Sequence, residues 1–90
     1  MKTIHKYPLQ FEESVCKLKM PINAKVLTVQ FQDDKLCLWA RVNDDEQQVE
    51  EREFRAYGTG EEVNEYDLEY IKTVQEHNGA LVWHIFENKS

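Results

Sequence analysis

The chain of 90 residues carries a net charge of −6, and 41% of its residues are hydrophobic. This length indicates a single domain, residues 1–90, and the apolar share is too high for a disordered chain. The negative charge argues against direct binding to nucleic acid or to an anionic membrane, since both need a basic surface. No apolar run reaches the roughly 18 residues that span a bilayer, and the opening MKTIHKYPLQ lacks the apolar region of a signal peptide.

The first two predicted strands are short, and a proline marks each of them. Residues 3–9 and 14–20 both read as strands. Pro8 removes a hydrogen-bond donor from the first strand, which favours a position at a sheet edge. Pro21 ends the second strand.

The next two predicted strands form a hairpin. Residues 25–32 read KVLTVQFQ, in which apolar side chains, beginning with Leu27, alternate with polar ones. Residues 36–42 read LCLWARV, and the leucine, alanine and valine side chains share one face. The segment 33–35, Asp-Asp-Lys, is typical of the turn between them, because short polar side chains hydrogen-bond to their own backbone.

The third part of the chain is more charged. Residues 43–48 form a polar loop, and residues 49–58 read VEEREFRAYG, with charged side chains alternating against Phe54 and Ala56. This pattern predicts a strand of the kind found at a sheet edge.

The last two predicted strands form a second hairpin. They cover residues 70–76 and 80–87, and the Asn-Gly pair at 78–79 is a strong hairpin signal because both residues tolerate positive φ. The final strand, ALVWHIFE, is apolar on both faces, which favours a central position in its sheet.

About seven strands separated by short turns predict an all-β, mostly antiparallel sandwich or barrel. We expect at most one short helical turn, near residues 63–69. Its apolar and aromatic side chains would reach the core: Val63, Tyr66, Leu68 and Tyr70.

Neither metal binding nor catalysis is indicated by the residue pattern. The histidines, His5, His77 and His84, lack metal-ligand spacing, and Cys16 and Cys37 lie singly in apolar runs, where thiols behave as small hydrophobes. Nucleophilic catalysis needs a hydroxyl or thiol beside a histidine and an orienting acid, and the sequence gives no sign of such a set. We therefore expect a protein that is not an enzyme and holds no metal ion or cofactor.

The turn Gly58-Thr59-Gly60 has two interpretations. It could cradle a phosphate with its backbone N–H groups, if an arginine or a second copy of the chain supplied positive charge. The favoured alternative is a simple bend at the end of a strand, because Glu61 and Glu62 follow and would repel a phosphate.

A group of aromatic and basic residues suggests a ligand site. Trp39, Arg41, Arg55 and Tyr57 are predicted to face outward from neighbouring strands. An aromatic plane beside arginine is a common way to hold a base or a protein anchor. Across the interface of a homo-oligomer, these residues and the glycine turn could sequester a nucleotide second messenger. The alternative is that Trp39 belongs to the core between two sheets.

A cluster of carboxylates suggests a protein-binding face. These residues are Glu61, Glu62, Glu65, Asp67 and Glu69. Such a surface could compete with nucleic acid for a basic protein. The alternative is ordinary solubilising charge.

Several segments resemble a family of small proteins of tailed phages and prophages. They are the opening MKTIHKYPL, then KVLTVQ, LCLWARV, YGTG, DLEYIKTVQ and the closing ALVWHIFE, in this order over residues 1–87. No activity, substrate or catalytic residue is assigned to that family, so none is transferred. The resemblance implies a phage accessory protein in the host bacterial cytoplasm. The loop at residues 43–49 is more polar than in that family, which matters little for a connector.

Together these features favour a non-enzymatic phage protein that binds and inhibits a host anti-phage defence protein, in the manner of an anti-CRISPR protein with an acidic surface. The first alternative is the homo-oligomeric nucleotide sponge. The second is a minor virion or assembly protein.

Overall fold

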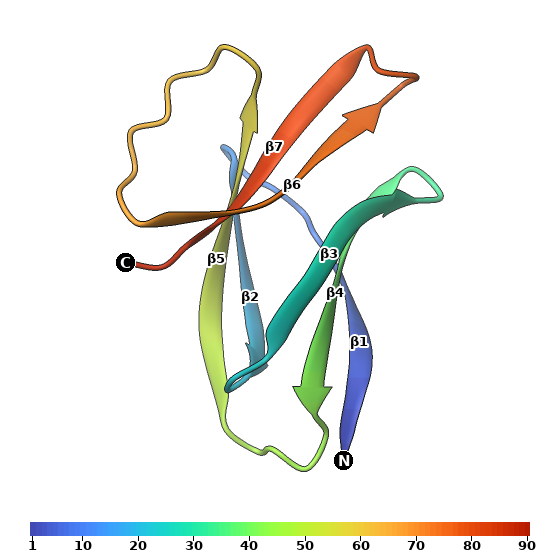
Figure 1. Cartoon of the computed structure of the whole chain (residues 1–90), viewed down its shortest axis with the longest axis vertical. Helices are drawn as coiled ribbons and strands as arrows, with labels where there is room; N and C mark the ends of the chain where they lie inside the picture. The colour runs from blue at the N-terminus through green and yellow to red at the C-terminus, as the bar shows by residue number, and fades with distance from the viewer.

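The computed structural model describes residues 1–90 and contains seven β-strands and no helix (Figure 1). The strands are β1 (Lys2–Pro8), β2 (Val15–Pro21), β3 (Lys25–Gln32), β4 (Lys35–Asn43), β5 (Val49–Gly58), β6 (Leu68–Glu76) and β7 (Leu81–Asn88). The predicted all-β fold class is therefore confirmed. No segment forms a helix with the length and apolarity that crossing a bilayer requires.

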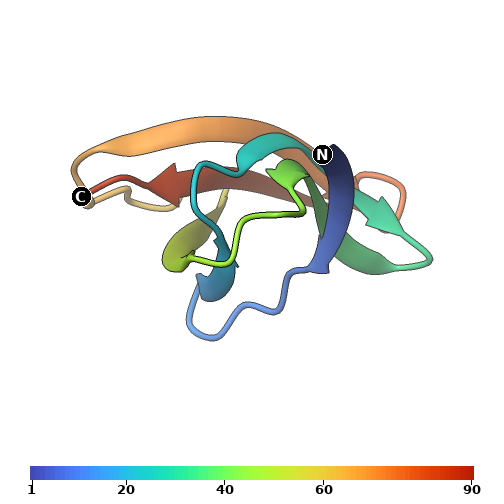
Figure 2. The same ribbon diagram turned by 90° about the horizontal axis from the view of Figure 1, so that it is seen from below.

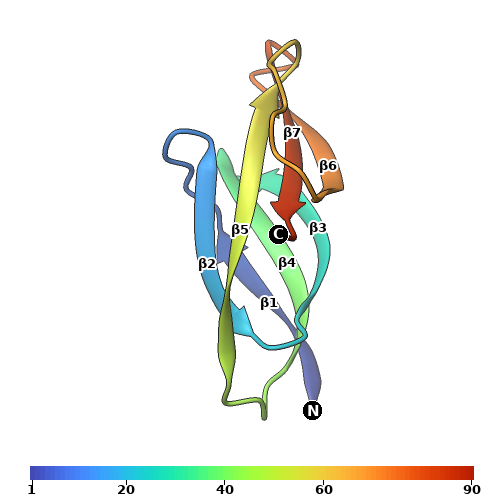
Figure 3. The ribbon, with the colours of Figure 1, turned by 90° about the vertical axis from the view of Figure 1, so that its left-hand side faces the viewer.

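The strands form two antiparallel sheets that pack as a β-sandwich. The three-stranded sheet has the order β1-β4-β3, and the four-stranded sheet has the order β2-β5-β7-β6. Figure 3 shows β2 and β5 in front of β1 and β4. Figure 2, seen from below, shows the β2–β3 and β4–β5 connections, which join strands of different sheets. As predicted, β1 lies at a sheet edge and β7 is internal.

The core lies between the two sheets, and the period-two pattern of the strands fills it. Its largest fully buried side chains are Met20, Val29, Leu38, Val42, Phe54 and Ile85. Each such side chain contributes about 1.5–3 kcal/mol relative to full exposure. Trp83 packs against this core from β7 and donates from Nε1 to Oε1 of Glu76, at 3.1 Å.

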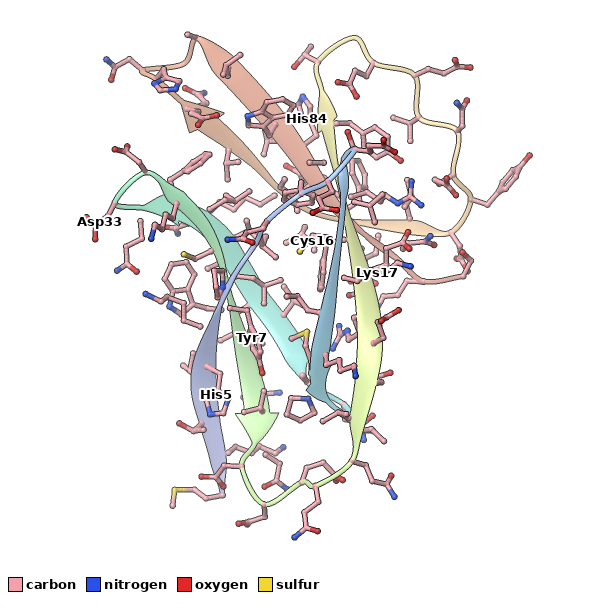
Figure 4. The ribbon with its side chains drawn as sticks, turned by 180° about the vertical axis from the view of Figure 1, so that it is seen from behind. His5, Tyr7, Cys16, Lys17, Asp33 and His84 are labelled. Atoms are coloured by element: carbon pink, nitrogen blue, oxygen red, sulfur yellow. The ribbon has the colours of Figure 1, made fainter.

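Both predicted hairpins are confirmed. Asp33 and Asp34 have φ angles of 50° and 65°, which is the positive-φ pair that a two-residue turn between twisted strands needs. At the β6–β7 turn, Asn78 and Gly79 have φ angles of 57° and 89°. Figure 4 labels Asp33 at the tip of the first hairpin.

The prediction for Leu27 was wrong. The pairing of β3 with β4 shifts between Val26 and Thr28, because Val26 lies opposite Ala40 while Thr28 lies opposite Trp39. Leu27 sits on this bulge and is exposed, and Val26 packs against the core instead.

The expectation that residues 49–58 form an edge strand was also wrong. β5 lies inside its sheet, between β2 and β7. Its charged side chains are compatible with that position because Lys17 and Lys19 of β2 lie opposite Glu53 and Glu51.

The helical turn expected near residues 63–69 does not form. Residues 61–67 have no helical or strand structure, and β6 begins at Leu68. Tyr66 and Tyr70 are exposed rather than part of the core. Glu61, Glu65 and Glu69 are spaced four residues apart, and like charges at this spacing destabilise a helix.

Candidate functional site

The carboxylates between β5 and β6 form one exposed segment, which we call the acidic segment, residues 61–69. Figure 1 shows this connection standing away from the two sheets. All five predicted residues are solvent-exposed: Glu61, Glu62, Glu65, Asp67 and Glu69. The segment contains no lysine or arginine, so its charge is of one sign.

The acidic segment is anchored at both ends. At its start, the backbone N–H of Glu61 donates to the carbonyl of Gly58, and at its end the N–H of Lys89 donates to the carbonyl of Asp67, at 3.1 and 2.9 Å. In the middle, Arg55 Nη1 lies 3.2 Å from Oε1 of Glu65. These contacts tie the segment to β5, through Gly58 and Arg55, and to Lys89, the residue after β7.

Two apolar side chains stand among these carboxylates. Tyr66 is 87% exposed and Val63 is 49% exposed. Large exposed aromatics are unusual because they leave apolar surface in water, and tyrosine is enriched among residues that anchor protein interfaces. The sequence prediction had assigned both side chains to the core, so this feature was missed.

Within one chain, the glycine turn forms a bend with a carboxylate beside it; anion binding across a subunit interface stays a prediction. Gly60 has a φ of +92°, a conformation that L side chains rarely adopt, which confirms the need for glycine there. A bend made by positive φ at both glycines is not what forms, because Gly58 has no positive φ. At Gly58 the constraint is space, since Oε1 of Glu61 would lie 3.2 Å from an added Cβ. A carboxylate therefore occupies the space beside the turn.

Thr59 of this turn belongs to a chain of hydrogen bonds on the outer face of the four-stranded sheet. Its Oγ1 lies 2.8 Å from Nε2 of His84, whose Nδ1 lies 2.9 Å from Oγ1 of Thr73, and that oxygen lies 2.7 Å from the hydroxyl of Tyr70. Figure 4 shows His84 on β7, next to the end of β5.

These hydrogen bonds bring the Thr59 hydroxyl and the His84 imidazole together, which the sequence analysis did not predict. In a catalytic triad, however, a carboxylate on the far ring nitrogen stabilises the imidazolium. Here Thr73 occupies that place and carries no charge. The hydrogen bond with His84 orients Thr59, which lies two residues before the acidic segment.

The structure divides the predicted ligand-binding residues between two faces. Trp39 and Arg41 lie on the outer face of the three-stranded sheet, opposite Lys6 and Ile4 of β1. Arg55 and Tyr57 lie on β5 of the other sheet, so the expectation of neighbouring strands was wrong. One chain does not bring the two pairs together. Their combination across a subunit interface stays a prediction.

Arg55 is engaged within the chain. Its Nε lies 2.7 Å from Oε2 of Glu53, and this hydrogen bond raises the pKa of the guanidinium. In return, hydrogen bonds from Asn88 and Arg55 lower the pKa of the Glu53 carboxyl. A ligand at Arg55 would have to compete with both Glu53 and Glu65.

Tyr57 is buried and its hydroxyl has no hydrogen-bond partner. Its ring packs edge-on against Phe86, with centroids 5.8 Å apart. Tyr57 is therefore a packing residue of the outer face of β5.

A buried ion pair between Arg52 and Glu87 was missed by the sequence analysis. The two side chains are 11% and 5% exposed. Arg52 also donates to the carbonyl of Ala24, which ties β5 to the start of β3. The sequence pattern could have revealed this pair, because residues two apart in a strand point to the same face. Arg52 therefore shares the face of the core residue Phe54, and Glu87 shares that of the core residue Ile85.

The remaining candidate groups are the metal-ligand residue types and the two thiols. No cluster of three or more histidine, cysteine or carboxylate side chains is placed to hold a metal ion. Cys16 and Cys37 are buried and unpaired, and burial raises the pKa of the Cys16 thiol.

Comparison with known proteins gives one match. No curated protein and no solved structure matches the chain significantly. A family model described as Domain of unknown function (DUF7352) matches residues 1–90. Because this match covers the whole sequence given, the chain belongs to the DUF7352 family.

Proposed function

We propose that the protein is a non-enzymatic binding protein that docks a basic protein partner through its acidic segment. The observation that carries the proposal is Tyr66, which is 87% exposed within a segment that is anchored at both ends and bears only negative charge. An exposed aromatic supplies the anchor, and the surrounding carboxylates steer a basic surface toward it.

The free carboxylates of the segment support this proposal. Glu65 pairs with Arg55, and Glu69 lies 3.9 Å from Nζ of Lys89. Glu61, Glu62 and Asp67 form no ion pair and flank Val63 and Tyr66, so a partner would meet uncompensated charge beside apolar surface. Because the chain resembles tailed-phage proteins, the partner class to test first is a host anti-phage defence protein with a basic nucleic-acid channel. Its inhibition would occur in the bacterial cytoplasm.

The proposal is tested by site-specific photo-crosslinking in host cells. A photoreactive phenylalanine derivative replaces Tyr66, and the same derivative at Val49, which is 58% exposed at the far end of β5, is the control. We expect the derivative at position 66 to crosslink to one basic host protein, and the derivative at position 49 to give no such crosslink.

A charge-reversed variant sharpens the test. Glu61→Lys with Glu62→Lys, in the chain that carries the crosslinker at position 66, should abolish that crosslink because steering is lost. A crosslink of unchanged yield in this variant, or identical crosslinks from positions 66 and 49, would contradict docking through the acidic segment.

A further inference from the structure

The charges of this acidic protein are unevenly distributed between its two sheets. Residues directly opposite in an antiparallel pair point to the same face, so the strand registers assign each side chain to a face. By this rule the outer face of the β1-β4-β3 sheet carries five cations and no carboxylate. They are Lys2, Lys6, Lys25, Lys35 and Arg41. Tyr7 of β1 points to the opposite face, toward the core, as Figure 4 shows. We call the opposite, outward face the basic face.

The cations of the basic face differ from others in the chain in being free of salt bridges. All five are exposed, and none takes part in an ion pair. Lys6 donates from Nζ to Oε1 of Gln32 at 2.8 Å, a neutral partner that leaves its charge intact. Of the other six lysines and arginines of the chain, Arg52, Arg55 and Lys89 are paired with carboxylates. Lys72 of β6 reaches the edge of this face, where its Nζ donates to Oγ1 of Thr28 at 3.2 Å.

An indole lies in the middle of these cations. Trp39 of the central strand is half-buried and stands between Lys6 of β1 and Thr28 of β3. Two residues further along β4, on the same face, Arg41 lies between Ile4 and Lys25. Ile4 is 59% exposed. Neighbouring strands are about 4.8 Å apart, so a ring placed on Trp39 would have cations within reach on both sides.

This combination fits a single-stranded nucleic acid. Unpaired bases stack on an aromatic plane or on a guanidinium, while cations beside them contact the phosphates. A duplex keeps its base faces stacked inside, so it would offer the basic face only its phosphates. An anionic lipid surface fits less well, because insertion needs a continuous set of protruding apolar side chains. Among the paired residues of this face, Ile4 is the exposed large apolar side chain, and the indole is half-buried.

The net charge of −6 does not decide what this face binds. The acidic segment adjoins β5 and β6 of the other sheet. The nearest carboxylates lie in connections at the ends of this sheet: Asp33 and Asp34 in the β3–β4 turn, and Glu46, which lines one pocket with Lys2 and Arg41. Charges separated by more than a Debye length, about 10 Å at 0.1 M salt, are largely screened from one another, so the local charge of a face matters more for binding than the total charge. The sequence expectation of no direct nucleic-acid binding considered only the total charge.

We propose that the basic face is a binding site for single-stranded nucleic acid, with Trp39 stacking on a base and the surrounding lysines and Arg41 contacting phosphates. This site is separate from the acidic segment and goes beyond the proposed function. The two proposals can therefore fail independently.

The test is fluorescence anisotropy with labelled oligothymidylate and oligouridylate of about 15 nucleotides, within the range that one small β domain occupies. Three to five phosphate contacts predict that the logarithm of the affinity falls with the logarithm of salt concentration with a slope of roughly −2 to −3.5. A duplex of the same length should bind more weakly.

Two variants separate stacking from charge. Lys6→Gln with Arg41→Gln should lower the affinity and make the slope shallower by roughly 1.4, because two phosphate contacts are lost. Trp39→Leu should weaken binding roughly tenfold and leave the slope unchanged, since stacking involves no counterion release. The exposed Lys6 and Arg41 variants keep the test valid if Trp39→Leu fails to fold.

The matched control is Lys17→Gln with Lys19→Gln on β2, which removes two exposed cations from the other sheet. It should leave both affinity and slope unchanged, as should Tyr66→Ala. The proposal is overturned if no oligonucleotide binds at roughly 50 mM salt, or if the control weakens binding as much as the Lys6 and Arg41 variant. Binding to phosphatidylglycerol vesicles without binding to either oligonucleotide would also overturn it, in favour of a lipid surface.

Discussion

Arg52 of β5 and Glu87 of β7 form a buried ion pair joined by two hydrogen bonds, from Nε to Oε2 at 2.6 Å and from Nη2 to Oε1 at 2.8 Å. Removing one partner of such a pair leaves a buried charge without compensation. We expect Glu87→Gln to lower the free energy of unfolding by about 3 kcal/mol, measured by urea denaturation at pH 7. Glu12→Gln, an exposed carboxylate, is the control and should change it by less than about 0.5 kcal/mol. Equal stability of the two variants would contradict this role of the pair.

The same pair predicts a pH dependence. Burial works to raise the pKa of the Glu87 carboxyl, but the hydrogen bonds and charges of Arg52 and Lys89 outweigh it, so the pKa lies below its ordinary value. Because the folded pKa lies below the unfolded value of about 4.3, the stabilisation is complete above that value and is lost as pH falls through the folded pKa. Between about pH 5 and pH 3, the stability of Glu87→Gln should therefore fall less steeply than that of the natural chain. Parallel curves of urea midpoint against pH would show that Glu87 does not contribute.

Removal of the Tyr57 hydroxyl should stabilise the fold. This hydroxyl is buried without a partner, and an unsatisfied buried polar group costs about 1–3 kcal/mol. We expect Tyr57→Phe to raise the free energy of unfolding by about 1 kcal/mol, since the ring and its edge-on contact with Phe86 stay. A loss of stability in the same urea experiment would mean that the hydroxyl has a partner, such as an ordered water.

The two glycines of the turn should respond differently to alanine. Gly60→Ala forces a side chain into a φ of +92° and should cost more than about 1 kcal/mol, or several degrees in Tm. Gly58→Ala meets only the end of the Glu61 side chain, which can swing away, so its cost should be smaller. Thermal denaturation of both variants compares them directly, and an equal loss would refute the assigned roles.

The thiols should be protected in the folded protein. Cys16 and Cys37 are buried, and burial raises the pKa of Cys16, so little thiolate is available to react. We expect slow modification by a thiol-reactive dye at pH 7 and rapid modification of both after unfolding in urea. Complete reaction of both thiols in the native protein within the mixing time would contradict their burial.

Local signals in the sequence predicted the fold well. The Asp-Asp turn and the Asn-Gly turn each determine a hairpin, because their residues tolerate the positive φ that the turn requires. The wrong predictions for Leu27 and β5 depended on pairing between strands, which the local sequence does not show. The bulge at Leu27 reverses the alternation of β3, and only the register with β4 reveals it. The central place of β5 depends on Lys17 and Lys19 of a strand that lies far from it in the sequence.

The candidate sites were less predictable than the fold. The carboxylates of the acidic segment could be identified from composition, but the exposure of Tyr66 could not, because an aromatic at helical spacing usually belongs to a core. The basic face could not be seen in the sequence. Its cations come from β1, β3 and β4, and they share a surface only because those strands form one sheet.

The positions of β1 and β2 at sheet edges have a consequence for behaviour at high concentration. An exposed edge offers unpaired backbone groups to another molecule and can seed cross-strand aggregation. Each of these strands carries two lysines and ends in proline, which place charge and a missing N–H donor on the edge. The edge of β3 lies instead near β6, where Nζ of Lys72 donates to Oγ1 of Thr28 at 3.2 Å. Replacing the lysines or prolines of β1 and β2 with apolar residues should therefore make the protein precipitate or form fibrils while its core stays intact.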